Sequence, residues 1–277
     1  MELRRKVTVE ARKGYGPKSV RYVAFPSLHE PPLMISARLS IPNDERDEHP
    51  AVLLLHGTAG PSLREGGYAD LLNEAGFATL EPDQWTARGL VGGAASKPGS
   101  VLETLPDVFG ARQFLCEHPA VDDSKIGVLG FSFGGAAVML CANRRLNEQY
   151  PGTGRFAASI ALYPGVWSFN HLPGYEFENL VDTPLMMVTG DLDQFDDDPD
   201  IGPKFVEGLA EEDRRNVRAV VMRESHHGFD MPGVEKLASD PMSHRGAGGA
   251  FIMSCNPSAM NQSRGLAVEF FLSTLGG

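Results

Sequence analysis

KIGVLGFSFGGAAVML, residues 125–140, predicts an apolar strand, a sharp turn and an apolar helix in direct succession. The turn is a G-x-S-x-G pentapeptide with Ser132 at its centre, between Gly130 and Gly134. A serine in such a turn is sterically crowded, and only flanking glycines relieve the crowding. Its hydroxyl projects from the C-terminal edge of the sheet, beside the free N–H groups of the helix. Ser132 is therefore the candidate nucleophile, the alternative being a solvated serine in a glycine-rich turn.

A serine hydroxyl is a weak nucleophile, so this hypothesis requires a base to accept its proton. Residues 218–222 predict a strand, and His226 and His227 follow in the loop after it. Adjacent side chains in an extended loop point in opposite directions, so only one of them can reach the serine. We favour His227 because Gly228 beside it relaxes the backbone where the side chain must be aimed.

The carboxylate that orients this base has two candidates, Asp191 and Asp193. Both follow residues 184–189, a continuous apolar run that is typical of a buried parallel strand. Spacing alone does not decide between them. With either one, the chain order of serine, aspartate and histidine is the order expected when the nucleophile lies in a G-x-S-x-G turn of this kind.

An oxyanion site is predicted where the apolar strand 51–55 opens into the loop His56-Gly-Thr58-Ala-Gly60. We assign two backbone N–H groups to the developing oxyanion, those of Thr58 and Phe133. The second directly follows the candidate nucleophile. His56 is expected to be a structural hydrogen-bonding residue rather than a second catalyst.

Predicted strands alternate with predicted helices along the chain, which indicates an α/β fold with a mostly parallel sheet covered on both faces. The length of 277 residues and the lack of a linker predict a single domain, 1–277. An antiparallel N-terminal hairpin is expected first. The hairpin strands are 19–25 and 33–41, the later strands are 51–55, 77–81, 126–129, 157–162, 184–189 and 218–222, and the helices are 66–74, 104–117, 135–149, 202–211 and 258–275.

These motifs resemble those of the dienelactone hydrolase family, within the α/β-hydrolase superfamily. The resemblance implies an α/β-hydrolase fold and a catalytic triad of Ser132, Asp193 and His227, and it favours Asp193 over Asp191. It spans most of residues 30–275 and rests on the loop 56–60, Glu81-Pro-Asp83, the turn 130–135, Gly190-Asp-Leu-Asp193 and His227-Gly-Phe229.

The sequence departs from the type members of that family at two places. They carry a cysteine nucleophile and a glutamate in the oxyanion loop, where this chain has Ser132 and Gly57. They also hold a substrate carboxylate with two arginines. Only Arg88 offers a counterpart here, a solvated loop cation being the alternative, and Met231 stands where the second arginine would be. This departure from the family pattern favours a neutral ester or lactone as substrate.

Two loops are expected to shape the substrate pocket. The first, 85–99, is rich in glycine and begins with Trp85. The second, 164–182, is a candidate lid, in which Trp167 and Phe169 would line an acyl or alcohol pocket. A buried aromatic cap without substrate contact is the alternative for these aromatic side chains.

A further segment, 240–258, is expected to be a surface insertion. It could gate the site, form a dimer contact or have no role beyond the surface. The three cysteines are widely spaced and predict free thiols. The acidic run 196–200 lacks the ligand spacing of a calcium loop, so no metal is expected there. The sequence leaves the oligomeric state open, a homodimer being one option.

The net charge of −11 and the pI near 5.2 argue against binding to nucleic acid or to an anionic membrane. Residues 1–10 lack the apolar core of a signal peptide, and no stretch approaches membrane-spanning length. The expected location is therefore the cytoplasm.

Together these features predict a cofactor-independent serine hydrolase of small to medium carboxylic esters or lactones, acting through an acyl-enzyme. Ser132 would attack, His227 would transfer the proton and Asp193 would stabilise the imidazolium. Acyl transfer to a bound alcohol or amine is the enzymatic alternative. A binding protein that reuses the fold without catalysis is the other alternative.

Overall fold

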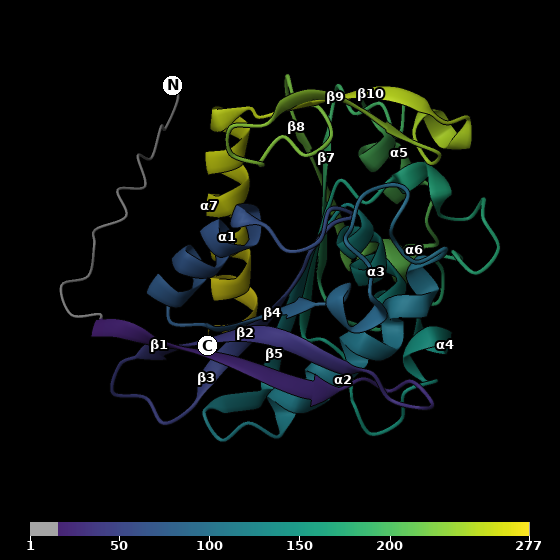
Figure 1. Cartoon of the computed structure of the whole chain (residues 1–277). Helices are drawn as coiled ribbons and strands as arrows, with labels where there is room; N and C mark the ends of the chain where they lie inside the picture. Colours follow the sequence, from purple (N-terminus) through teal and green to yellow (C-terminus); the bar gives the residue numbers. More distant parts are fainter. Residues whose placement is uncertain (1–15, 277) are drawn as a thin grey trace.

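Eight strands form one sheet in the computed structural model, which describes residues 16–276 (Figure 1). Their spatial order is β1-β2-β4-β3-β5-β6-β7-β8. All neighbours from β4 to β8 run parallel, whereas β1 and β2 form an antiparallel hairpin whose second strand pairs antiparallel with β4. The predicted fold class is thus confirmed. The strands are β1 (Gly16–Pro26), β2 (Met34–Asn43), β3 (His49–Leu55), β4 (Ala78–Asp83), β5 (Val121–Phe131), β6 (Ala158–Leu162), β7 (Leu185–Gly190) and β8 (Val217–Met222).

Helices cover both faces of the sheet, so the central strands are apolar on both sides. Residues 51–55 of β3 are completely buried. In Figure 1, α1 and α7 lie on one side of the sheet and α2, α3 and α5 on the other. The helices are α1 (Leu63–Glu74), α2 (Leu105–Cys116), α3 (Phe133–Ala142), α4 (Arg144–Asn147), α5 (Ile201–Glu207), α6 (Glu211–Arg214) and α7 (Pro257–Leu275), and four short 3-10 turns are η1 (Thr86–Arg88), η2 (Val101–Thr104), η3 (Val166–Ser168) and η4 (His244–Gly246).

Two predicted helices end earlier in the structure than expected. The expected helix 135–149 is interrupted at Asn143, whose extended backbone ends α3. Its side-chain oxygen accepts the N–H of Leu146 and so caps α4, a role for which asparagine is well suited. The expected helix 202–211 stops at Glu207, and α6 follows as a separate single turn.

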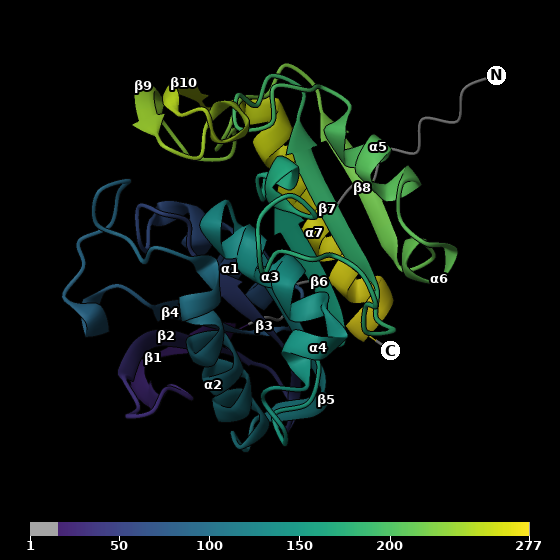
Figure 2. The same ribbon diagram turned by 90° about the vertical axis from the view of Figure 1, so that its right-hand side faces the viewer.

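The expected insertion 240–258 belongs to an antiparallel hairpin that begins earlier, with β9 (Glu235–Asp240) and β10 (Gly249–Ser254). This hairpin stands apart from the main sheet, at the end of the molecule where α7 begins (Figures 1 and 2). Phe251 points inward and is 5% exposed, whereas Leu237 is 71% exposed. The hairpin therefore turns one apolar side chain toward the ends of β7 and β8.

None of the helices in residues 16–276 combines the length and the apolar composition that a membrane-spanning segment requires. The prediction for residues 1–10 lies outside the part of the chain that the structure describes.

Helix α7 packs on the sheet through the fully buried ring of Phe271. Phe271 packs against Phe77 and lies over Gly127 of β5, where an added Cβ would approach the ring to 2.6 Å. The missing side chain at Gly127 thus makes room for Phe271, and the two positions depend on each other.

Phe271→Ala is expected to lower the free energy of unfolding by about 3–5 kcal/mol, because it leaves a cavity between α7 and β5. Urea denaturation measures this loss. The adjacent Leu272 is 46% exposed, so Leu272→Ala is the matched control and should change stability by about 0.5 kcal/mol or less. Equal losses in the two variants would contradict this account of how α7 is held.

Candidate active site

Ser132 joins β5 to α3 in a backbone conformation that side chains rarely adopt, with φ of 52° and ψ of −112°. The flanking glycines make it possible. A Cβ on Gly130 would lie 2.1 Å from the carbonyl oxygen of Gly134, and a Cβ on Gly134 would lie 2.3 Å from that of Leu55. The Ser132 N–H donates to the Leu162 carbonyl of β6 at 2.9 Å, which fixes the turn against the sheet.

Three predicted residues lie in one hydrogen-bonded row. Ser132 Oγ is 2.8 Å from His227 Nε2, and His227 Nδ1 is 2.8 Å from Asp193 Oδ2. The other carboxylate oxygen of Asp193 accepts the N–H of Phe195. The Asp193 carboxylate can only accept a hydrogen bond, so the proton of the neutral His227 imidazole is on Nδ1. The lone pair is then on Nε2, where it can accept the serine proton. Both His227 and Asp193 are only 4% exposed, so little water competes for these bonds.

The alternative base and carboxylate have other partners. Asp191 accepts the N–H of Ser225 and lies 3.8 Å from Arg223. The Nδ1 atom of His226 lies 3.1 Å from the carbonyl oxygen of Leu192. Both residues therefore hold the loops after β7 and β8 together, and neither is directed at the serine.

Aromatic rings enclose the His227 imidazole. Phe195 stacks on it with a centroid distance of 4.0 Å, and Tyr163 meets it edge-on at 5.0 Å. Phe251 of the β9–β10 hairpin adds a perpendicular contact at 5.8 Å and packs against Phe195. Sequence reasoning missed these three rings, because nothing in their local pattern indicates the histidine. They restrict the imidazole to the orientation that serves Ser132.

Both expected oxyanion donors lie beside Ser132 at the cavity wall. Phe133 is the first residue of α3, so its N–H has no partner within the helix. The Thr58 carbonyl accepts two hydrogen bonds, from the Trp85 indole at 3.0 Å and from the Gly93 N–H at 2.8 Å. These bonds fix the loop that presents the Thr58 N–H. His56 is buried, and its Nε2 accepts the N–H of Gln84, as a structural residue would.

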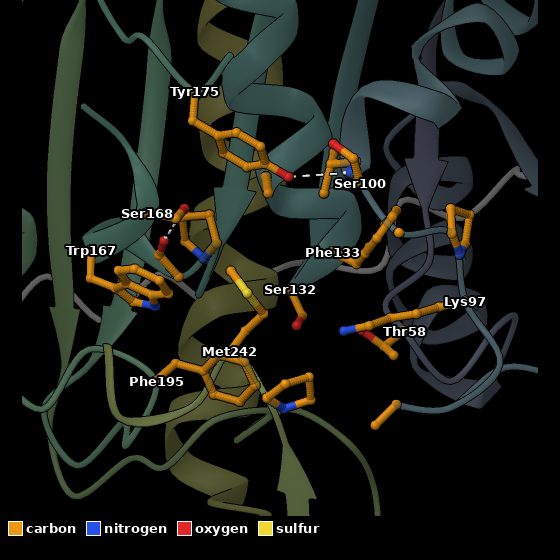
Figure 3. Close-up of a pocket in the computed structure, with 18 residues that line it drawn as sticks. Thr58, Lys97, Ser100, Ser132, Phe133, Trp167, Ser168, Tyr175, Phe195 and Met242 are labelled. Carbon is orange, nitrogen blue, oxygen red and sulfur yellow. Dashed lines mark hydrogen bonds between the residues drawn. The ribbon is translucent and has the colours of Figure 1, made fainter. Parts of the chain in front are cut away.

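A cavity of about 310 Å³ opens at Ser132. Figure 3 shows Trp167, Phe195 and Met242 on one side of the serine and Thr58, Phe133 and Lys97 on the other. Its wall is mostly apolar, with hydroxyl groups from Ser100, Ser168 and Tyr175 at the margin. Such a cavity accommodates an uncharged group with few polar atoms.

Lys97 is the only charged side chain among the described residues that line the cavity. Its Nζ lies 3.0 Å from one carboxylate oxygen of Asp240 and 3.4 Å from the other, and the two side chains are 15% and 6% exposed. This ion pair joins the segment 85–99 to the end of β9. It also cancels the charge of the ammonium group beside the cavity.

Three of the four side chains expected to contact substrate are engaged elsewhere, and only Trp167 lines the cavity. Arg88 forms an ion pair with buried Asp107 at 2.7 Å. Trp85 is 2% exposed and supports the oxyanion loop from behind. Phe169 is completely buried and packs against other aromatic rings of the 164–182 segment. None of these three side chains lines the cavity.

A buried polar network lies behind the Ser132 turn, and no pattern in the sequence indicated it. The Arg64 guanidinium lies 4.3 Å from the centroid of the Phe131 ring and donates to Glu65 and to the Tyr163 hydroxyl. Tyr163 in turn donates to Asp230, whose pKa is raised by burial. The network connects α1 to the ends of β5 and β6 and to the loop of His227, so it stiffens the base of the site.

No cluster of three or more metal-ligating side chains occurs in residues 16–276. In the acidic run, Asp198 pairs with Lys204 at 2.8 Å, and Asp196 accepts a backbone N–H. The three cysteines are free thiols, as predicted.

Comparison with known proteins agrees with this architecture. The sequence matches the family model of the dienelactone hydrolase family over residues 35–274. A comparison with curated protein sequences finds no match.

Among solved structures, the fold is similar to that of a putative dienelactone hydrolase from Klebsiella pneumoniae, with 14% identity, a TM-score of 0.68 and coverage of 92% of this chain and 99% of that one. It is also similar to a dienelactone hydrolase-like promiscuous phosphotriesterase from metagenomic libraries, with 18% identity, a TM-score of 0.68 and coverage of 94% and 100%. A third similar structure is esterase 2 from Thermogutta terrifontis, phosphorylated by paraoxon, with 16% identity, a TM-score of 0.63 and coverage of 92% and 94%.

At these identities the structural likeness shows the fold alone. The family match, by contrast, extends from β2 to the end of α7 and includes every residue of the hydrogen-bonded row. The chain belongs to the dienelactone hydrolase family and is a carboxylic ester hydrolase.

Proposed function

We propose that this chain hydrolyses neutral carboxylic esters or lactones through an acyl-enzyme on Ser132. The observation that carries the proposal is the row of two 2.8 Å contacts from Ser132 through His227 to Asp193. A serine on a strained turn, a base with its lone pair toward the serine and a buried carboxylate behind that base form the arrangement required for nucleophilic catalysis.

The chemistry follows from this arrangement. Ser132 Oγ attacks the ester carbonyl while His227 Nε2 accepts its proton. The N–H groups of Thr58 and Phe133 stabilise the oxyanion, each contributing about 3 kcal/mol to transition-state stabilisation. His227 then donates the proton to the departing alcohol, and the Asp193 carboxylate stabilises the imidazolium in between. Water, activated by the same histidine, releases the acid.

The cavity supports an uncharged substrate of small to medium size. Its volume is about 310 Å³, and Lys97, the one cation that residues 16–276 place at its wall, is already neutralised by Asp240. A carboxylate on the substrate would have to compete with Asp240 for Lys97, and it would meet the Asp240 charge as it approached. Neutral acyl groups face no such cost.

Paraoxon is a suitable probe of the nucleophile, since the esterase from Thermogutta terrifontis was crystallised phosphorylated by it. The wild-type chain is expected to gain one diethylphosphoryl group at Ser132, detected by intact mass and peptide mapping. Ser132→Ala should gain none and lose ester turnover. His227→Ala should lower kcat for a p-nitrophenyl ester by roughly 10³-fold or more, because no base remains.

Ser168 is the matched control for this experiment, since it is a second serine at the cavity wall whose Oγ donates to the Gly165 carbonyl. Ser168→Ala should be phosphorylated like wild type. A persistent adduct in Ser132→Ala, or no adduct and no ester turnover in folded wild type, would refute the proposed nucleophile.

The charge balance at Lys97 gives a second prediction, on substrate choice. Asp240→Asn leaves the ammonium uncompensated and should raise kcat/KM for an ester with an anionic acyl group, relative to a neutral ester of equal length, by about fivefold or more. Lys97→Gln should lower the same ratio. Glu235→Gln, at an exposed acid of the same hairpin, is the control. An unchanged ratio in Asp240→Asn would contradict a role of this ion pair in substrate choice.

A further inference from the structure

Asp196 lies three residues after Asp193 and is 1% exposed, yet the catalytic row does not include it. Its Oδ1 accepts the backbone N–H of Trp167 at 2.8 Å. Its own N–H donates to the Asp193 carbonyl at 3.3 Å. A single buried side chain therefore connects the loop of the catalytic carboxylate to η3, whose residues Trp167 and Ser168 line the cavity.

The second oxygen of this carboxyl group, Oδ2, is buried and accepts no hydrogen bond from any residue that the structure describes. A buried carboxylate with one bare oxygen is strongly unfavourable, whereas a neutral carboxylic acid avoids the charge. Burial is the main influence on the Asp196 carboxyl, and the negative charge of Asp193 acts in the same direction. The backbone N–H groups of Trp167 and Val166 favour the charged form and oppose this effect only in part, so the pKa of Asp196 is raised from 3.8 to about 8.

The charged surroundings of Asp196 come from two elements. Asp193 belongs to its own loop, and Arg245 belongs to η4, where its positive charge partly opposes the effect of Asp193. The His227 imidazole is hydrogen-bonded to Asp193 Oδ2. The loop itself is fixed from the far side, because the His244 N–H donates to the carbonyl of Gln194 and the Arg245 N–H to that of Phe195.

We propose that Asp196 is a positioning residue that, as a neutral carboxylic acid, holds the cavity wall at Trp167 against the loop of the triad aspartate. The proposal rests on the proposed serine hydrolase function. When Asp196 ionises, a second negative charge lies buried beside Asp193. The unfavourable energy is relieved if water reaches Oδ2, and that requires η3 or the Asp193 loop to move.

The test is the pH profile of kcat/KM for a neutral p-nitrophenyl ester between pH 6 and 10, corrected for the Ser132→Ala background. Wild type should lose activity as the pH passes the pKa of Asp196, by about tenfold one to two units above it. Asp196→Asn preserves the shape and the uncharged state of the acid, so it should retain near wild-type activity at pH 7 and no longer show this alkaline loss. Asp196→Ala removes the acceptor of the Trp167 N–H and should be about tenfold less active at pH 7.

Asp198 supplies a matched control in the same acidic run. It is paired with Lys204, and that bond lowers its pKa. Asp198→Asn removes one nearby negative charge but leaves the bond to η3 in place. Its loss of kcat/KM at alkaline pH should therefore equal that of wild type. An unchanged alkaline loss in Asp196→Asn, or equal activity losses at pH 7 in Asp196→Asn and Asp196→Ala, would overturn the proposal.

Stability supplies an independent readout. An acid whose pKa is raised in the folded protein destabilises the fold progressively as the pH rises from its unfolded pKa to its folded pKa, because the unfolded chain releases the proton first. The Tm of Asp196→Asn minus the Tm of wild type should therefore increase as the pH rises from about 4 to about 8. A difference in Tm that does not vary with pH would overturn the neutral-acid assignment. Paraoxon labelling of Ser132 in every variant distinguishes a failure of this proposal from a failure of the proposed function. The labelling reports on the nucleophile independently of the protonation state of Asp196.

Discussion

The close approach of backbone atoms around Ser132 is the constraint on which the rest of the site depends. The chain must leave β5, reverse within one residue and start α3. Backbone carbonyl oxygens lie only 2.1 and 2.3 Å from the positions that a Cβ on Gly130 or on Gly134 would occupy. This geometry directs the hydroxyl outward and leaves the first N–H of α3 free. Everything else in the site is arranged around that fixed point.

Two groups of interactions hold the remaining parts against it. Behind the turn, the network of Arg64, Tyr163 and Asp230 fills the base with satisfied polar contacts. In front, Phe195 and Phe251 press on the imidazole of His227 from segments that are more than fifty residues apart. The polar groups of the site are therefore held by a buried polar network on one side and by aromatic rings on the other, which is how a solvent-poor site keeps its electrostatic preorganisation.

The fold was largely predictable because buried parallel strands appear in the sequence as continuous apolar runs. Gly130 and Gly134 also limit the backbone conformations that the turn between them can adopt. The choice of Asp193 over Asp191 came from the family resemblance, since both follow the same strand. Arg88 was misjudged because its partner, Asp107, belongs to a later helix, and ion pairs between distant segments leave no local pattern. The β9–β10 hairpin was missed because β9 is short, polar and exposed, without the alternation that marks a half-buried strand.

That hairpin has a further consequence. It enters the chain between the loop of His227 and α7, and it forms no strand of the main sheet. It nevertheless contributes Phe251 to the imidazole, Met242 to the cavity and Asp240 to the ion pair with Lys97. The hydrogen-bonded row from Ser132 to Asp193 and part of the cavity wall are thus encoded in separable segments. A hairpin of different length or composition could be exchanged at this point to alter the shape and charge of the cavity, while the sheet and the Ser132 turn remained as they are.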